Sequence, residues 1–107
     1  MAYKVTDVTG MDFADMTAQQ GMTLFDLWSP DCAPCRALAP ILDDLANDFA
    51  GEVRICKADI AADTGLGERF AVRALPTLAL YRDGAEVDRI IGFRSRADLT
   101  SWLERHL

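Results

Sequence analysis

Residues 28–36 read Trp-Ser-Pro-Asp-Cys-Ala-Pro-Cys-Arg, and this stretch carries two thiols, Cys32 and Cys35, three positions apart. It lies where a nearly continuous apolar run, residues 22–28, gives way to a helical pattern. A thiol in the first turn of a helix faces unpaired backbone N–H groups and the positive end of the helix dipole, and both stabilise the thiolate. Because the thiolate is the form that attacks disulfides, the stretch predicts a reactive cysteine pair.

Composition narrows the class of protein around this pair. The chain has 107 residues, 50% of them hydrophobic, so it can build one core, and we expect a single domain over residues 1–107. The formal net charge is −6 and basic residues are scattered singly, which disfavours nucleic acid and anionic lipid as partners and favours protein substrates. The sequence has three cysteines, no signal-peptide pattern and no apolar run of membrane-spanning length. We therefore expect a cytoplasmic protein, and we expect it to be a monomer.

Turn residues and apolar spacing predict the element order β-α-β-α-β-α-β-β-α. We expect strands at residues 3–8, 22–28, 53–58, 77–81 and 86–91, and helices at residues 12–20, 33–49 and 64–70, with a closing helix capped by Ser95. Pro40 falls inside the long helix, where its ring should cause a kink. A central mixed sheet with helices on both faces would bury every apolar face, so the predicted fold class is α/β.

The Cys-x-x-Cys pair begins a helix after a buried strand in an α/β order, and this position makes it a more specific signal than the pair alone. The whole chain resembles the thioredoxin family. The resemblance is carried by Phe25-Asp26-Leu27-Trp28, by residues 32–36, and by Pro40, Lys57, Leu75-Pro76-Thr77, Gly84 and Gly92. It implies a thioredoxin fold with a five-stranded sheet, in which Cys32 attacks protein disulfides and Cys35 resolves the mixed disulfide. It also implies a flavin-containing thioredoxin reductase as electron donor, although the chain itself shows no cofactor-binding signature.

The resemblance further implies where clients bind. Pro76 would follow a cis peptide bond and leave the backbone of Leu75 free to pair with an extended client segment. Otherwise Pro76 only starts a strand. The residues expected to contact substrate are Trp28, Asp31, Ala33, Pro34, Leu75, Pro76 and Gly92.

Asp26 and Lys57 are the polar residues expected to assist the thiols. Asp26 shares one face of an apolar strand with Leu24 and Trp28, so burial should raise the pKa of its carboxyl. Such an acid near the cysteines can take and return a proton. Lys57 shares a face of its predicted strand with Val53 and Ile55 and is expected to reach toward the same acid, and a purely structural ion pair between the two is the alternative.

A metal site and a third redox-active thiol are the less favoured interpretations of the cysteines. A structural metal site needs four ligands, and beyond the pair the chain offers only Cys56 and a lone His106, so a redox pair is favoured over a metal site. Cys56 lies in the middle of a predicted strand and is interpreted as an inert core thiol. His106 stands one residue from the end of the chain and is interpreted as solvated.

The chain departs from the family pattern Trp-Cys-Gly-Pro-Cys-Lys, for which it has Asp-Cys-Ala-Pro-Cys-Arg at residues 31–36. Asp31 removes an aromatic docking surface and places a negative charge beside Cys32, whose thiolate should be less favoured than in a typical member. Alternatively, Asp31 is simply the N-cap of the long helix. Two rival functions follow: a dedicated reductant of a narrow partner set, and a non-catalytic binding module with a groove around Pro76.

Overall fold

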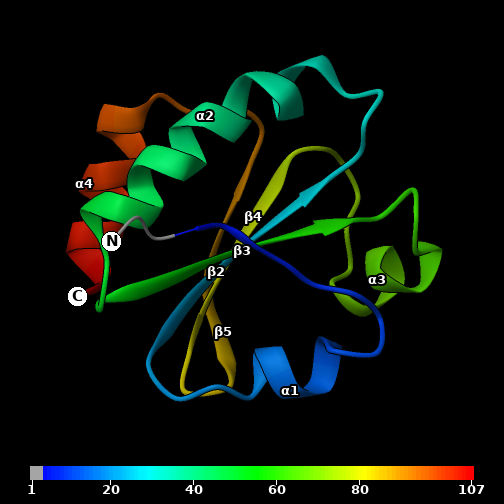
Figure 1. Ribbon diagram of the computed structural model, residues 1–107, viewed down its shortest axis with the longest axis horizontal. Coiled ribbons are helices and arrows are strands. Elements are labelled where there is room, and N and C mark those ends of the chain that lie inside the picture. The colour runs from blue at the N-terminus through cyan, green and yellow to red at the C-terminus, as the bar shows by residue number, and fades with distance from the viewer. Residues whose placement is uncertain (1–3) are drawn as a thin grey trace.

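The computed structural model describes residues 4–107 as a mixed sheet with helices on both faces (Figure 1). The strands are β1 (Thr6–Asp7), β2 (Met22–Trp28), β3 (Val53–Asp59), β4 (Thr77–Arg82) and β5 (Ala85–Ile91). The helices are α1 (Phe13–Thr17), α2 (Ala33–Asp48), α3 (Thr64–Arg69) and α4 (Arg96–His106). The predicted element order and the mixed α/β sheet are therefore confirmed.

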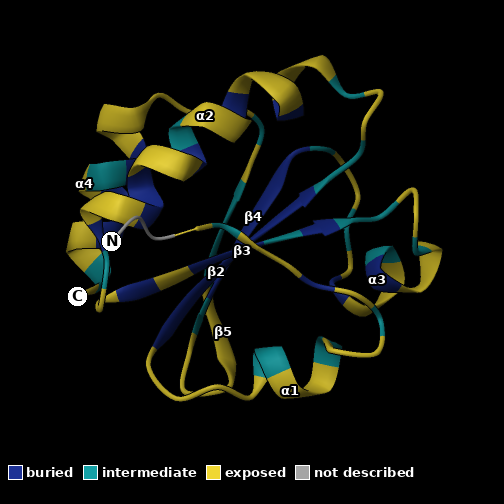
Figure 2. Ribbon diagram, in the orientation of Figure 1, coloured by how far each residue is buried: buried dark blue, intermediate teal, exposed yellow. Residues whose placement is uncertain are grey.

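The five strands lie in the order β1-β3-β2-β4-β5, which puts β2 at the centre of the sheet. β2 pairs in parallel with β3 and antiparallel with β4. Because both of its faces are covered, residues 22–27 are all buried, and this explains the continuous apolar run (Figure 2). The cysteine pair follows a short loop after the half-buried end of this strand at Trp28, so the central strand of the sheet leads to the site.

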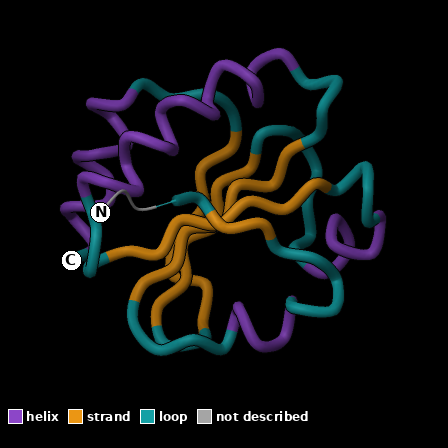
Figure 3. Tube along the Cα trace, in the orientation of Figure 1, coloured by secondary structure: helices purple, strands orange, loops and turns teal. Residues whose placement is uncertain are grey.

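Two apolar cores lie on the two faces of the sheet. α2 and α4 cover one face, where Leu24 and Leu38 pack with Trp102, and α1 and α3 cover the other, where Phe25 packs with Phe70 (Figure 3). Alternation along β2 sends side chains to the two cores in turn. Asp26 therefore lies on the same face as Leu24, beneath α2, as the sequence predicts.

The predicted boundaries differ most at the start of the chain. The first strand was expected over residues 3–8, yet β1 spans only Thr6–Asp7, and residue 3 lies outside the described residues. The helix expected over residues 12–20 is the five-residue α1, none of whose residues is fully buried, although Phe13 and Met16 pack against the core on that face. The other boundaries lie within one or two residues of those predicted, and α2 continues through Pro40.

The interpretation of His106 as a solvated residue is wrong. Its Nε2 atom lies 2.8 Å from Oδ2 of Asp88, and its ring meets Trp102 edge to face.

The predicted Ser95 cap is confirmed, because the Ser95 hydroxyl accepts a hydrogen bond from the backbone N–H of Asp98. None of the helices within residues 4–107 has the length and apolar character needed to cross a bilayer.

Candidate active site

The two cysteines begin α2 and are joined as a disulfide, with their Cα atoms 5.2 Å apart. Cys32 is half-buried, whereas Cys35 is only 2% exposed. The backbone N–H of Cys35 lies 3.2 Å from Sγ of Cys32 and donates a hydrogen bond to it. In the reduced protein the same donor would stabilise a thiolate on Cys32. The helix start thus presents one accessible sulfur and shields the other.

Cys32, not Asp31, is the N-cap of α2. Cys32 has an extended backbone, and its sulfur accepts the capping hydrogen bond. The alternative that Asp31 caps the helix is therefore wrong, because Asp31 lies one residue too early and is exposed. Arg36 ties down the preceding loop by donating from Nη1 to the carbonyl of Pro30 at 2.6 Å. The Asp31 charge is thus held beside Cys32 with no capping role.

A small cavity of about 160 Å³ lies behind the cysteines, and Asp26, Trp28, Cys35 and Lys57 contribute to its lining. Asp26 is 3% exposed, and its Oδ1 atom has no hydrogen-bond partner within residues 4–107. Burial raises the pKa of the Asp26 carboxyl to about 7, although the nearby Lys57 ammonium opposes part of this rise. The raised pKa predicted from the sequence is confirmed, so this carboxyl can exchange a proton near neutral pH.

Lys57 is placed beside Asp26 by strand register but is bound elsewhere. Asp7, Lys57 and Asp26 stand in one row across β1, β3 and β2. The Lys57 ammonium lies 3.9 Å from Oδ1 of Asp7 and 5.4 Å from the ring centroid of Trp28. In the described part of the chain no ion pair joins Lys57 to Asp26, so the alternative of a structural pair between them is not what the structure has. Sequence reasoning missed Asp7, whose role depends on the register of β1.

The peptide bond between Leu75 and Pro76 is cis, as the resemblance implies. Leu27 on β2 pairs with Thr77 on β4, so this bond lies at the same edge of the sheet as the cysteine loop. The carbonyl of Pro76 accepts a hydrogen bond from the backbone N–H of Gly92 at 2.8 Å. Pro76 and Gly92, distant in sequence, are thereby joined at this edge.

Two exposed apolar side chains beside Gly92 were not predicted from the sequence. Ile91 is 50% exposed and Phe93 is 43% exposed. They flank the residue that binds Pro76, so apolar surface lies next to the cis bond. A signal was present, because large apolar residues follow one another where a strand ends in a polar loop. Of the other expected contact residues, Trp28 is half-buried, and Ala33 and Pro34 are exposed on the first turn of α2.

The remaining thiol is inert by its surroundings. Cys56 is unpaired and buried in the core between β3 and α3. Burial raises the pKa of its thiol to about 11, with Arg54 opposing part of the effect. A buried thiol that resists ionisation is a poor nucleophile, as expected for a core cysteine.

In this α/β fold the helix that follows the central strand begins with a disulfide-forming Cys-x-x-Cys pair. This arrangement defines the class of thiol–disulfide oxidoreductases. The family model described as thioredoxin matches residues 4–105 of this chain. Over 103 residues the chain is 36% identical to the thioredoxins of Staphylococcus saprophyticus and Staphylococcus haemolyticus, covering 96% of this chain and 98% of each relative. The chain belongs to the thioredoxin family, and its activity is the reduction of protein disulfides through the Cys32–Cys35 pair.

Solved structures agree with this assignment. A mutant thioredoxin from Halobacterium salinarum matches with a TM-score of 0.86 at 27% identity, covering 95% of this chain and 89% of that one. A Malassezia sympodialis thioredoxin has the same fold, with a TM-score of 0.87 at 22% identity over 97% of this chain and 91% of that one. The predicted thioredoxin fold is therefore confirmed.

Proposed function

We propose that Cys32 is the attacking thiol and Cys35 the resolving thiol in the reduction of client disulfides. The observation that carries this assignment is the difference in exposure between the two sulfurs at the start of α2. An incoming client reaches Cys32, whereas Cys35 is shielded by its own helix. Cys35 reacts fastest with the neighbouring sulfur of Cys32 once that sulfur is bonded to a client, because the two sulfurs are held side by side.

The reaction proceeds in two exchanges. The Cys32 thiolate forms a bond to one client sulfur, the client S–S bond breaks, and the second client sulfur leaves as a thiolate. The Cys35 thiolate then attacks Sγ of Cys32, and the first client sulfur leaves. The client has gained two electrons, and the cysteine pair has become the disulfide.

Asp26 serves as the proton acceptor for Cys35 in the second exchange. Both residues line the same cavity, and the carboxyl has a free oxygen and a pKa of about 7. A cavity of this size has room for a water molecule that can carry the proton between the two groups. Lys57 tunes the acceptor, because its positive charge favours the ionised carboxyl.

Clients bind as an extended segment along the cis bond. The edge formed by Leu75, Pro76 and Gly92 lies next to Trp28, and Ala33 and Pro34 present the first turn of α2. Exposed Ile91 and Phe93 add apolar contact area beside Gly92. Asp31 repels acidic client segments and thereby narrows the range of clients.

The proposed function includes an electron donor, an oligomeric state and a cellular location for the chain. A flavin-containing thioredoxin reductase returns the disulfide to the dithiol, as membership of the thioredoxin family suggests. The chain acts as one domain over residues 1–107 and as a monomer in the cytoplasm. The family assignment supports disulfide-containing clients and a reductase donor.

Trapping with a Cys35→Ser variant tests the order of attack. This variant should accumulate a mixed disulfide between Cys32 and a client such as insulin, because nothing remains to release it. The matched Cys32→Ser variant should form no adduct, and it should not accelerate insulin reduction above the rate with dithiothreitol alone. Adducts on Cys35 in the Cys32→Ser variant would reverse the assignment.

A further inference from the structure

β5 contains one residue more than the stretch of β4 it pairs with. Tyr81 pairs with Glu86, but the next residue of β4, Leu80, pairs with Asp88, so Val87 has no partner. An extra residue of this kind is a β-bulge, which bends a strand and redirects the side chains that follow it.

The bulge decides which faces the charged residues of β5 occupy. Glu86 and Arg89 are three positions apart, and in a regular strand they would point to opposite faces. Their partners on β4 are Tyr81 and Ala79, which share one face. Glu86 and Arg89 therefore meet on the α3 side of the sheet, while Asp88 turns to the opposite side, toward α4.

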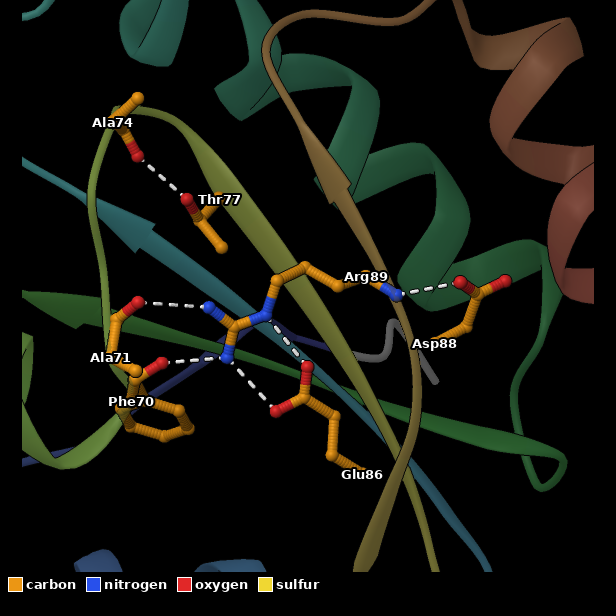
Figure 4. A network of polar contacts seen from close by, with 7 residues as sticks. All are labelled: Phe70, Ala71, Ala74, Thr77, Glu86, Asp88 and Arg89. Carbon is orange, nitrogen blue, oxygen red and sulfur yellow. Dashed lines mark hydrogen bonds and ion pairs between the residues drawn. The ribbon is translucent and has the colours of Figure 1, made fainter.

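Arg89 uses this placement to bridge the hairpin and the loop that follows α3 (Figure 4). Its Nε and Nη2 atoms donate to the Glu86 carboxylate at 2.6 and 2.9 Å. Nη2 also donates to the carbonyl of Phe70 at 2.6 Å, and Nη1 donates to that of Ala71 at 3.1 Å. A planar fork neutralised by Glu86 thus holds two neighbouring carbonyls, which a single ammonium cannot do with the same geometry.

The loop held in this way leads directly to the cis bond. Ala71 has a φ of 54°, a left-handed conformation that a non-glycine residue adopts only where its surroundings impose it. At the other end of the loop, the Thr77 hydroxyl donates to the carbonyl of Ala74 at 2.6 Å (Figure 4). Both ends of residues 70–77 are fixed, and Leu75 and Pro76 lie between them.

We infer that Arg89 is a positioning residue for client binding, which holds residues 70–76 so that Leu75 and Pro76 meet the client already ordered. A segment ordered before binding loses less conformational entropy when a client docks. This inference rests on the proposed docking of clients at Leu75 and Pro76. It adds to that proposal a residue on another element, outside the surface the client touches.

The test compares a protein disulfide with a small one. Reduced Arg89→Gln protein is reacted with insulin, and separately with 5,5′-dithiobis(2-nitrobenzoate), which needs only the cysteine pair. The rate constant with insulin should fall about three- to tenfold, the size that corresponds to the net contribution of one ordinary intramolecular hydrogen bond. The rate constant with the small disulfide should stay unchanged. Arg89→Lys keeps the charge but not the fork, so it should show the same selective loss.

Arg96→Gln is the matched control. Arg96 also forms ion pairs, with Asp44 and Asp48, but these join α4 to α2 on the other face of the sheet. This variant loses the same charge and should keep both rate constants. A loss equal for insulin and the small disulfide in Arg89→Gln would overturn the inference, because it would indicate damage to the cysteine pair.

Hydrogen exchange and Pro76→Ala separate this inference from the docking proposal. In Arg89→Gln the backbone amides of Ala71 and Val72, which donate to the carbonyls of Glu68 and Gly67, should exchange faster than in the original protein, and unchanged exchange would overturn the positioning role. If Pro76→Ala slows insulin reduction and Arg89→Gln does not, only the role of Arg89 is overturned. If the loop loosens and both variants keep the insulin rate, the docking site at Leu75 and Pro76 is itself wrong, and the inference fails with it.

Discussion

Asp26 and Lys57 are direct partners in the register of β2 and β3, yet Lys57 forms its ion pair with Asp7. The buried carboxyl is therefore left with a neighbouring positive charge but without a bonded cation. Its burial dominates over that charge, and its pKa rises to about 7. A tight pair with Lys57 would have kept the carboxylate ionised and unable to hold a proton near neutral pH.

Asp26→Asn should slow the release of the mixed disulfide more than its formation. Cys35 must lose a proton before it attacks, whereas Cys32 at the helix start is activated by backbone donors. Loss of a general base is expected to slow the second exchange on the order of 100-fold or more. Stopped-flow measurement of both exchanges with insulin resolves the two steps. Equal slowing of both would show that Asp26 is not specific to the second step.

The same substitution should change how stability depends on pH. The Asp26 pKa is raised on folding, so between about pH 4 and pH 7 the unfolded chain ionises this group while the folded protein keeps its proton. Folding stability should therefore fall as pH rises through this window, by an amount on the order of 4 kcal/mol for this group. Denaturant melts of both proteins at pH 4 and pH 8 measure it. Asp26→Asn should be the more stable protein at pH 8, and a lower stability there would contradict the burial argument.

Asp31→Trp should raise the thiolate fraction of Cys32 and widen the range of clients. The change removes a negative charge beside the nucleophile and adds an apolar surface, and it sacrifices no helix cap because Cys32 holds that position. Thiolate absorbance against pH and insulin reduction are the two measurements. Asp31→Asn separates the effects, since it should change the absorbance curve without the gain in clients. An unaltered curve in both variants would mean that the Asp31 charge is screened by solvent.

Cys32 should be the only thiol alkylated quickly in the reduced protein. Cys35 is shielded by α2, and burial raises the pKa of Cys56 to about 11. Mass spectrometry after brief treatment with iodoacetamide locates the label. Preferential labelling of Cys35 or Cys56 would be incompatible with the proposed order of attack.

Asp88→Ala should destabilise the contact between β5 and α4. The indole N–H of Trp102 donates to the Asp88 carboxylate at 2.7 Å, and His106 binds the same oxygen at 2.8 Å. Removing the acceptor leaves a largely buried donor unpaired, which costs about 1–3 kcal/mol. Urea melts check this value, and a double-mutant cycle with Trp102→Phe isolates the pair. Additive effects in that cycle would show that the hydrogen bond contributes nothing.

The cost of Asp88→Ala should also shrink in acid. The hydrogen bonds from Trp102 and His106, together with one from the backbone of Arg89, hold the pKa of Asp88 below its usual value. A carboxyl whose pKa is lowered on folding adds stability above its unfolded pKa, and this contribution is lost as pH falls through the folded pKa. The difference between Asp88→Ala and the original protein should therefore be smaller at pH 3 than at pH 7 in the same urea melts.

The features that depend only on neighbours along the chain could be predicted from the sequence. The apolar run of β2 predicted a strand covered on both faces, and the cysteines after it predicted a reactive helix start. Asp26 could be placed in the core because alternation along one strand needs no knowledge of the rest of the fold. The Ser95 cap followed from its spacing to Asp98.

The contacts between groups that are distant in sequence depend on how the strands pair and the helices pack, and they could not be predicted. Lys57 binds Asp7 because β1 adds to the sheet in one register, and His106 is half-buried because Asp88 faces α4. One extra residue in β5 turns Asp88 toward α4. The same extra residue lets Arg89 bridge to the loop before Pro76. A bulge leaves no pattern in apolar spacing along an exposed edge strand, so the partners of its side chains are set by the pairing of strands and the packing of helices against them.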